Sequence, residues 1–70
     1  MKKIYIKTEH IKLDSFLKLC GEASTGGEAK EIILNGFVKV LGETCYQRGK
    51  KITTGSKISV NGNEYKVIKE

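Results

Sequence analysis

The chain has 70 residues, and a domain of this size buries only about 60% of its unfolded surface, which leaves little room for a deep substrate cavity. Apolar residues make up 39% and charged residues 30%, a composition typical of a folded chain and not of a disordered one. No apolar run exceeds a few residues, so no segment is long enough to span a membrane, and the net charge of +5 favours phosphate-rich partners. No apolar signal core follows the basic N-terminus, so we expect a cytoplasmic protein. We also expect residues 1–70 to form one domain that acts as a monomer.

The first elements that the sequence predicts are a short strand and a short helix. Residues 4–7 alternate apolar and other side chains, which indicates a strand with its isoleucines inward. Asp14 is a natural N-cap and Gly21 a natural stop, so we expect a helix over residues 15–20. The apolar residues that recur at helical spacing here are Leu13, Phe16, Leu17 and Cys20.

A second helix has stronger start signals. Thr25 and Glu28 fit a capping box, with Thr25 as the N-cap and Glu28 at the third helical position. Gly36 is suited to ending the helix, because glycine adopts the left-handed conformation at little cost. The inward stripe consists of Ala29, Ile32 and Ile33.

After the second helix the apolar period becomes two. Residues 38–40, 58–60 and 65–67 each place two apolar side chains on one face, as expected of short strands. The Asn-Gly dipeptide at 61–62 predicts a hairpin between the last two strands, and residues 41–43 predict another turn. The order of elements is therefore strand, helix, helix and several short strands, a small α+β unit whose helices pack together.

Catalysis and metal binding find little support in the sequence. Cys20 and Cys45 are far apart and form no CxxC pattern; one disulfide is possible, but two half-buried reduced thiols are favoured. His10 is the only histidine, and its neighbours favour a surface or strand-edge position over a ligand or a catalytic base. We therefore expect no enzyme, no cofactor and no metal.

The start of the second helix is a candidate phosphate site. Thr25, Gly26 and Gly27 present backbone N–H groups at a helix N-terminus, and glycine lets an anion approach closely. The P-loop pattern is absent, which disfavours nucleotide hydrolysis. An RNA phosphate fits the same turn.

Positive charge is concentrated in two parts of the chain. Residues 1–13 and 38–57 are strongly basic, whereas residues 14–37 are net acidic, so a basic patch forms if the two flanks meet in space. Arg48, Lys50 and Lys51 are expected to form a flexible basic loop. The other basic candidates are Lys18, Lys30 and Lys39.

Aromatic residues are too few for a stacking platform. Tyr5, Tyr46 and Tyr65 are candidates to stack a base, whereas Phe16 and Phe37 are expected in the core. Recognition through shape and phosphate contacts is therefore favoured.

Four segments resemble the RNA-binding domain first described in ribosomal protein S4. Residues 12–17, KLDSFL, resemble its RLDxFL opening, and residues 28–33 resemble its second helix. The strand GFVKV at 36–40 is similar to the GxVxVNG segment, and GSKISV at 55–60 to the closing GDxIxV segment. The order and spacing agree over residues 12–60, and the TGGEAK and RGKK stretches look most like the small stand-alone bacterial members, the YaaA/YbcJ-like group.

The resemblance implies two short helices (the alpha-L RNA-binding motif) packed on a small, bent, mostly antiparallel sheet. It implies binding of structured RNA without catalysis, with ribosomal RNA or the assembling large ribosomal subunit as the expected partner. The first turn of the second helix and the adjoining strand are the implied RNA-facing parts. On this chain those positions are Gly26, Gly27, Lys30 and Lys39, with Lys12 and Lys18 as neighbours.

The chain departs from the family pattern at three positions. Gly26 stands where many members have Arg or Lys, so backbone N–H groups replace a side-chain phosphate contact there. Leu41 replaces the usual Asn of the turn, and Ser56 replaces the usual Asp.

Two other functions compete with RNA binding. A protein–protein adaptor would use its basic surface only for solubility, and it predicts an exposed apolar patch and binding that survives high salt; the sequence shows no surplus of apolar residues outside the expected core. A nucleotide-binding enzyme would use the Thr25–Gly27 turn, and it predicts binding of labelled nucleotide.

Overall fold

The computed structural model describes all residues 1–70, which form two helices and seven strands. In chain order these are β1 (Lys2–Ile6), β2 (His10–Lys12), α1 (Leu13–Leu19), α2 (Gly26–Leu34), β3 (Val38–Val40), β4 (Glu43–Thr44), β5 (Lys51–Thr53), β6 (Lys57–Val60) and β7 (Asn63–Lys69). The predicted α+β class and the order of its main elements are confirmed.

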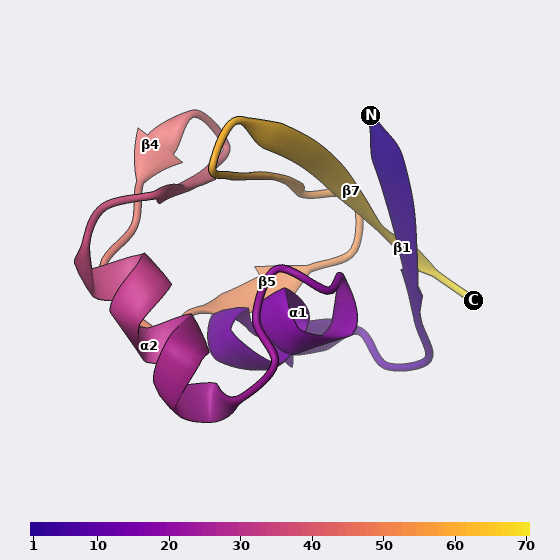
Figure 1. Ribbon diagram of the computed structural model, residues 1–70. Helices are drawn as coiled ribbons and strands as arrows, with labels where there is room; N and C mark the ends of the chain where they lie inside the picture. The colour runs from indigo at the N-terminus through magenta and orange to yellow at the C-terminus, as the bar shows by residue number, and fades with distance from the viewer.

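The strands form two sheets. The larger has the order β1-β7-β6-β3-β4, in which β1 runs parallel to β7 and all other pairs are antiparallel. The smaller is the antiparallel pair β2-β5. Both helices lie on one side of the larger sheet (Figure 1), and β5 pairs with β2, which leads directly into α1. The other face of the larger sheet is left open to solvent.

The core lies between the helices and the inner face of the larger sheet. Phe16 of α1 is fully buried, and its ring meets that of Tyr65 on β7 edge to face, with centroids 6.0 Å apart. Ile52 brings β5 into the same core. The remaining buried apolar side chains are Ile6, Leu13, Leu17, Ala23, Ala29, Ile33, Val38, Ile58, Val60 and Val67.

The start of α1 differs from the prediction. The helix begins at Leu13, so Asp14 lies inside its first turn and is not the N-cap; the N-cap is Lys12, whose side chain makes no capping bond. The backbone N–H groups of Leu13 and Asp14 instead donate to the carbonyls of Lys50 and Arg48, at 2.9 and 3.0 Å. The chain segment before β5 thus supplies acceptors that a capping side chain provides elsewhere.

The predicted boundaries of α2 are confirmed. The Thr25 hydroxyl accepts the Glu28 N–H at 3.1 Å, and the Glu28 carboxylate accepts the Ser24 N–H at 3.0 Å, one residue before the N–H that a capping box uses. Gly36 follows the last turn with φ +81°, and the Phe37 N–H donates to the carbonyl of Ile32. This is the Schellman arrangement that ends many helices.

Both predicted turns of the sheet are confirmed. Asn61 and Gly62 have φ of 51° and 84°, and Val60 pairs directly with Asn63, so the hairpin loop has two residues. Leu41 and Gly42 have φ of 53° and 86° in the β3-β4 turn. A leucine therefore occupies a left-handed position that Asn or Gly fills more readily.

Two aromatic assignments from the sequence are wrong. Phe37 was expected in the core, but its side chain is 55% exposed, because alternation from the buried Val38 turns it outward. Tyr65 was a candidate for base stacking, but alternation places it in the core, where it is 6% exposed. Tyr5 and Tyr46 are exposed and remain available for stacking.

A polar contact joins the helix linker to the last hairpin. The Glu22 carboxylate accepts hydrogen bonds from the Tyr65 hydroxyl and, at 3.0 Å, from the Asn63 side-chain amide. The Tyr65 bond lowers the pKa of Glu22, and the same bond, with burial, raises the pKa of Tyr65 to about 12. The carboxylate thus links the segment between the two helices to the β6-β7 hairpin.

Candidate nucleic-acid interface

Four basic side chains come together at the start of α1. Lys12 closes β2, Lys51 opens β5, and Arg48 and Lys50 lie in the segment whose carbonyls cap α1. We call Lys12, Arg48, Lys50 and Lys51 the α1 basic cluster. All four are exposed, and they come from the two basic flanks of the sequence, which the β2-β5 pair brings side by side.

Lys12 and Lys51 face each other across the β2-β5 ladder. Leu13 N–H donates to the Lys50 carbonyl, and bonded and non-bonded pairs alternate along an antiparallel ladder, so Lys12 and Lys51 form a non-hydrogen-bonded pair. In such a pair the Cα atoms lie about 4.5 Å apart and the side chains project together. Like charges directly opposite one another destabilise a sheet, so an anion between them is favoured.

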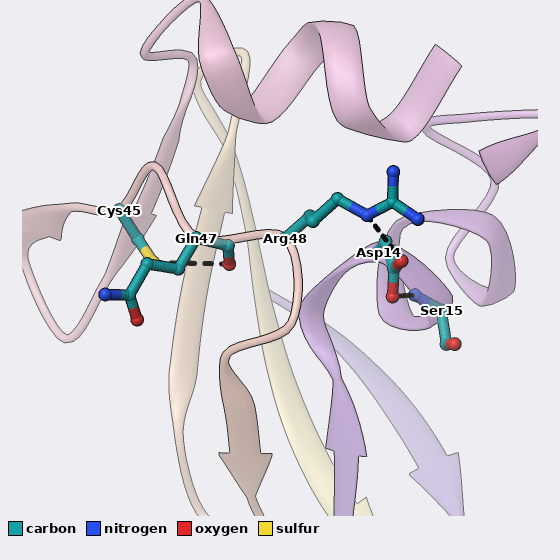
Figure 2. Close-up of polar contacts among 5 residues, drawn as sticks. All are labelled: Asp14, Ser15, Cys45, Gln47 and Arg48. Carbon is teal, nitrogen blue, oxygen red and sulfur yellow. Dashed lines mark hydrogen bonds and ion pairs between the residues drawn. The ribbon is translucent and has the colours of Figure 1, made fainter. Parts of the chain in front are cut away.

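The segment that carries Arg48 is held in place. Besides its two backbone bonds to α1, Arg48 Nε lies 3.6 Å from Asp14 Oδ2, and Asp14 Oδ1 accepts the Ser15 N–H at 2.7 Å (Figure 2). A free loop was expected here, and Lys51 belongs to a strand. The contact uses only Nε, which leaves the two terminal nitrogens of the guanidinium for a ligand.

The start of α2 offers backbone donors and little charge. The N–H groups of Gly26 and Gly27 have no acceptor within the chain, and no atom lies within 4 Å of the point that a Gly26 Cβ would occupy. A phosphate has free access to both. Lys30 follows on the next turn, but Glu28 and Glu31 are exposed on the same helix, so the net charge of α2 is negative.

The other two predicted lysines lie apart from the α1 basic cluster. Lys18 is exposed in the last turn of α1. Lys39 is exposed on β3, where it pairs with Ser59 and so shares the outer face of the larger sheet, opposite the helices. The structure therefore separates Lys39 from Gly26, Gly27 and Lys30, with which the sequence grouped it.

Three lysines that the sequence analysis did not select lie on the same outer face. Lys57, Lys66 and Lys3 are direct neighbours across β6, β7 and β1. Alternation alone marks each as outward, but only the strand order places them in one row.

Other chemistry is sparsely represented. Cys20 and Cys45 are half-buried free thiols, and burial raises the pKa of Cys20, which keeps it in the unreactive thiol form. No group of three or more His, Cys, Asp or Glu side chains is placed to hold a metal ion. Neither helix has the length and apolar content needed to cross a membrane.

Comparison with known proteins gives one consistent family. The family described as S4 domain matches residues 4–68. The chain is 36% identical over 62 residues to the putative RNA-binding protein YbcJ of Escherichia coli K12, covering 89% of each chain. YbcJ of Shigella flexneri matches over the same length with the same identity.

Two solved structures have the same fold. The solution structure of E. coli YbcJ, described as revealing an alfaL motif involved in RNA binding, matches with a TM-score of 0.73 and 33% identity over 97% of this chain and 87% of that one. The 30S ribosomal protein S4e of Thermoplasma acidophilum matches with a TM-score of 0.66 and 28% identity. That match covers 86% of this chain and 32% of S4e. The expected alpha-L helix pair on a mostly antiparallel sheet is thus the fold of these proteins.

Proposed function

This chain belongs to the S4 domain family, and from that premise we propose that it is a non-enzymatic protein that binds structured RNA through phosphate and shape contacts. Residues 1–70 act as one domain in this proposal, with the α1 basic cluster as the main contact and the start of α2 as the second. The proposal rests on the family and on the charge geometry together.

The observation that carries the proposal is the unneutralised charge at the α1 basic cluster. The chain contains two ion pairs, Arg48 with Asp14 and Lys69 with Glu9. Lys12 and Lys51 therefore face each other with no carboxylate within 4.0 Å of either. A phosphate placed between them attracts both lysines, and these two attractions offset the repulsion between the lysines.

The two contacts differ in chemistry. Lys12, Lys50 and Lys51 supply mobile point charges, while Arg48, oriented by Asp14, offers a planar donor group suited to a phosphate. At the start of α2, the free backbone N–H groups of Gly26 and Gly27 are positioned to donate hydrogen bonds to a phosphate, as a helix N-terminus does in many phosphate sites. Such contacts read the path of the RNA backbone and not its sequence.

We further propose that the RNA is ribosomal, in a mature ribosome or in an assembling large subunit, and that binding takes place in the cytoplasm. The support is the S4 family itself. Ultraviolet crosslinking in growing cells, followed by sequencing of the attached RNA, tests this. We expect a dominant site in ribosomal RNA; crosslinks spread over abundant RNAs would contradict a ribosomal target.

An adaptor function is favoured by one observation. Phe37, Leu41 and Tyr46 are each more than half exposed, so the fold shows more surface apolar area than the sequence suggested. An adaptor would capture a protein whose binding persists at high salt, whereas RNA binding through several phosphates weakens steeply as salt rises. Affinity measured at two salt concentrations separates the two functions.

A further inference from the structure

The outer face of the larger sheet carries a row of three lysines. Lys57 pairs with Lys66 across β6-β7, and Lys66 pairs with Lys3 across β7-β1. Neighbouring strands lie about 4.8 Å apart, so the three Cα atoms span about 10 Å. We call Lys3, Lys57 and Lys66 the sheet lysine row; Lys39 on β3 lies on the same face.

The pairing brings these charges close together. Val67 N–H donates to the Ser56 carbonyl at 3.0 Å, so the next pair along the ladder, Lys57 with Lys66, is of the non-hydrogen-bonded kind with closely spaced side chains. Lys66 is half-buried between its two neighbours. Like charges in direct register destabilise a sheet, so an anion beside the three lysines is favoured.

The sheet lysine row is not neutralised by the protein. Neither ion pair of the chain involves its members, although Glu64 lies on the same face. A shallow hollow extends from Lys57 toward Lys39, and Leu41, Ser59 and Glu64 also line it. The face therefore has a net positive charge, which suits a phosphate chain.

The composition of this face favours nucleic acid as its occupant. Its exposed apolar side chains lie at its two ends: Tyr5, which pairs with Ile68 and is 52% exposed, and Leu41 in the β3-β4 turn, which is 68% exposed. Protein interfaces are depleted in lysine at their centre, whereas lysines clustered on one face are the electrostatic footprint of nucleic-acid binding. Tyr5 stands two residues from Lys3 on the same face and can stack an unpaired base.

We propose that the sheet lysine row is a second RNA-backbone surface and that the protein joins two RNA segments. The inference rests on the proposed function and adds a second site to it. The α1 basic cluster and the sheet lysine row lie on opposite sides of the core, since Ile52 enters the core from β5 while Tyr65 and Val67 enter it from β7. The body is 18 Å across at its thinnest, so the two surfaces engage different phosphates.

Two matched variants of the full chain test the proposal, each removing three charges. The sheet variant combines Lys3→Gln, Lys57→Gln and Lys66→Gln, and the helix-side variant combines Lys12→Gln, Lys50→Gln and Lys51→Gln. Fluorescence anisotropy with a short RNA duplex between about 50 and 200 mM salt measures the slope of log Kd against log salt. We expect each variant to lower the steepness of that slope by about 2–3, at about 0.7–0.9 for each phosphate that the variant no longer neutralises.

Energy transfer between a donor-labelled and an acceptor-labelled duplex measures joining. With RNA in excess, wild-type protein brings the two labels together and each variant abolishes the transfer. A sheet variant with wild-type slope and wild-type transfer overturns the inference. A helix-side variant with wild-type affinity overturns the proposed function instead, so the two failures are distinguishable.

Two controls complete the experiment. Circular dichroism should show the sheet variant melting at or above the wild-type temperature, because repulsion has been removed; if it is unfolded, Lys57→Gln alone replaces it, and the slope should then fall by about 0.7–0.9. Vesicles of phosphatidylcholine and phosphatidylserine test a membrane as the occupant. A sheet variant that no longer binds vesicles while keeping its RNA affinity and transfer overturns the proposal.

Discussion

Replacing Lys51 with glutamate should make the protein more stable and at the same time a weaker RNA binder. Lys51 faces Lys12 in a non-hydrogen-bonded pair, and both side chains are exposed, so the substitution disturbs no packing. It converts a like-charge pair into an opposite-charge pair. A substitution at a purely structural position is expected to lower stability, so a gain in stability together with a loss of RNA affinity identifies a binding residue.

The gain in stability follows from the geometry. Charges about 6 Å apart in a watery environment interact by about 0.7 kcal/mol, and a cross-strand pair contributes about 0.2–1 kcal/mol. Removing the repulsion and adding the attraction should raise the free energy of unfolding by about 1 kcal/mol. For a domain of this size that corresponds to a rise in Tm of about 4–8 °C. Raising the salt should reduce the gain, because the pair is exposed.

The reduced affinity follows from counterion release. Each phosphate contact contributes about 0.7–0.9 to the slope of log K against log salt. At about 0.1 M salt, relative to about 1 M, each contact therefore raises the affinity by about five- to eightfold. Lys51→Glu removes one contact and neutralises Lys12, which removes a second. We expect the affinity for RNA to fall by about 25- to 60-fold.

Thermal melting by circular dichroism and fluorescence anisotropy with an RNA hairpin measure the two effects. Lys7→Glu, in the exposed turn between β1 and β2, is the control for net charge and should change affinity only slightly. The double variant with Lys12→Glu restores a like-charge pair, so its Tm should return toward the wild-type value. The reasoning is refuted if Lys51→Glu binds RNA as tightly as wild type, or if it melts at a lower temperature.

Three further predictions concern the fold. Leu41→Asn should raise stability by about 1 kcal/mol, because the left-handed φ of 53° is costly for an exposed leucine; a Leu41→Ala variant melting equally high would contradict this. Because the pKa of Glu22 is lowered in the folded protein, this carboxylate contributes to stability above its ordinary pKa of 4.5, and the contribution is lost as the pH falls below that value. Because the pKa of Tyr65 is raised to about 12, the contribution of this hydroxyl to stability is lost as the pH rises from 10 toward about 12. Tyr65→Phe should therefore show a smaller drop in Tm on acidification than wild type, and equal drops would count against the contact. Phe16→Ala should cost about 3–5 kcal/mol, most of the stability of so small a domain, and a cooperative melt near the wild-type Tm would show that the side chain is not buried as described.

Much of the fold was determined by residues close to one another in the chain. The Thr25 cap, the Gly36 stop and the two-residue hairpin at Asn61 depend on side-chain chemistry within a few positions, so the sequence predicts them directly. The alternation after Gly36 likewise predicts which face of each strand is buried. Applied consistently, that alternation would also have placed Phe37 outside the core.

Only the tertiary structure decided which charges meet. Alternation shows that Lys57 and Lys66 point outward, but it carries no information about which strand lies beside which, because pairing depends on contacts between distant segments. The three residues of β2 are too few to show a period, and their pairing with β5 creates the α1 basic cluster. In the same way, the acceptors that cap α1 come from Arg48 and Lys50, far along the chain, which is why a local signal at Asp14 was misleading.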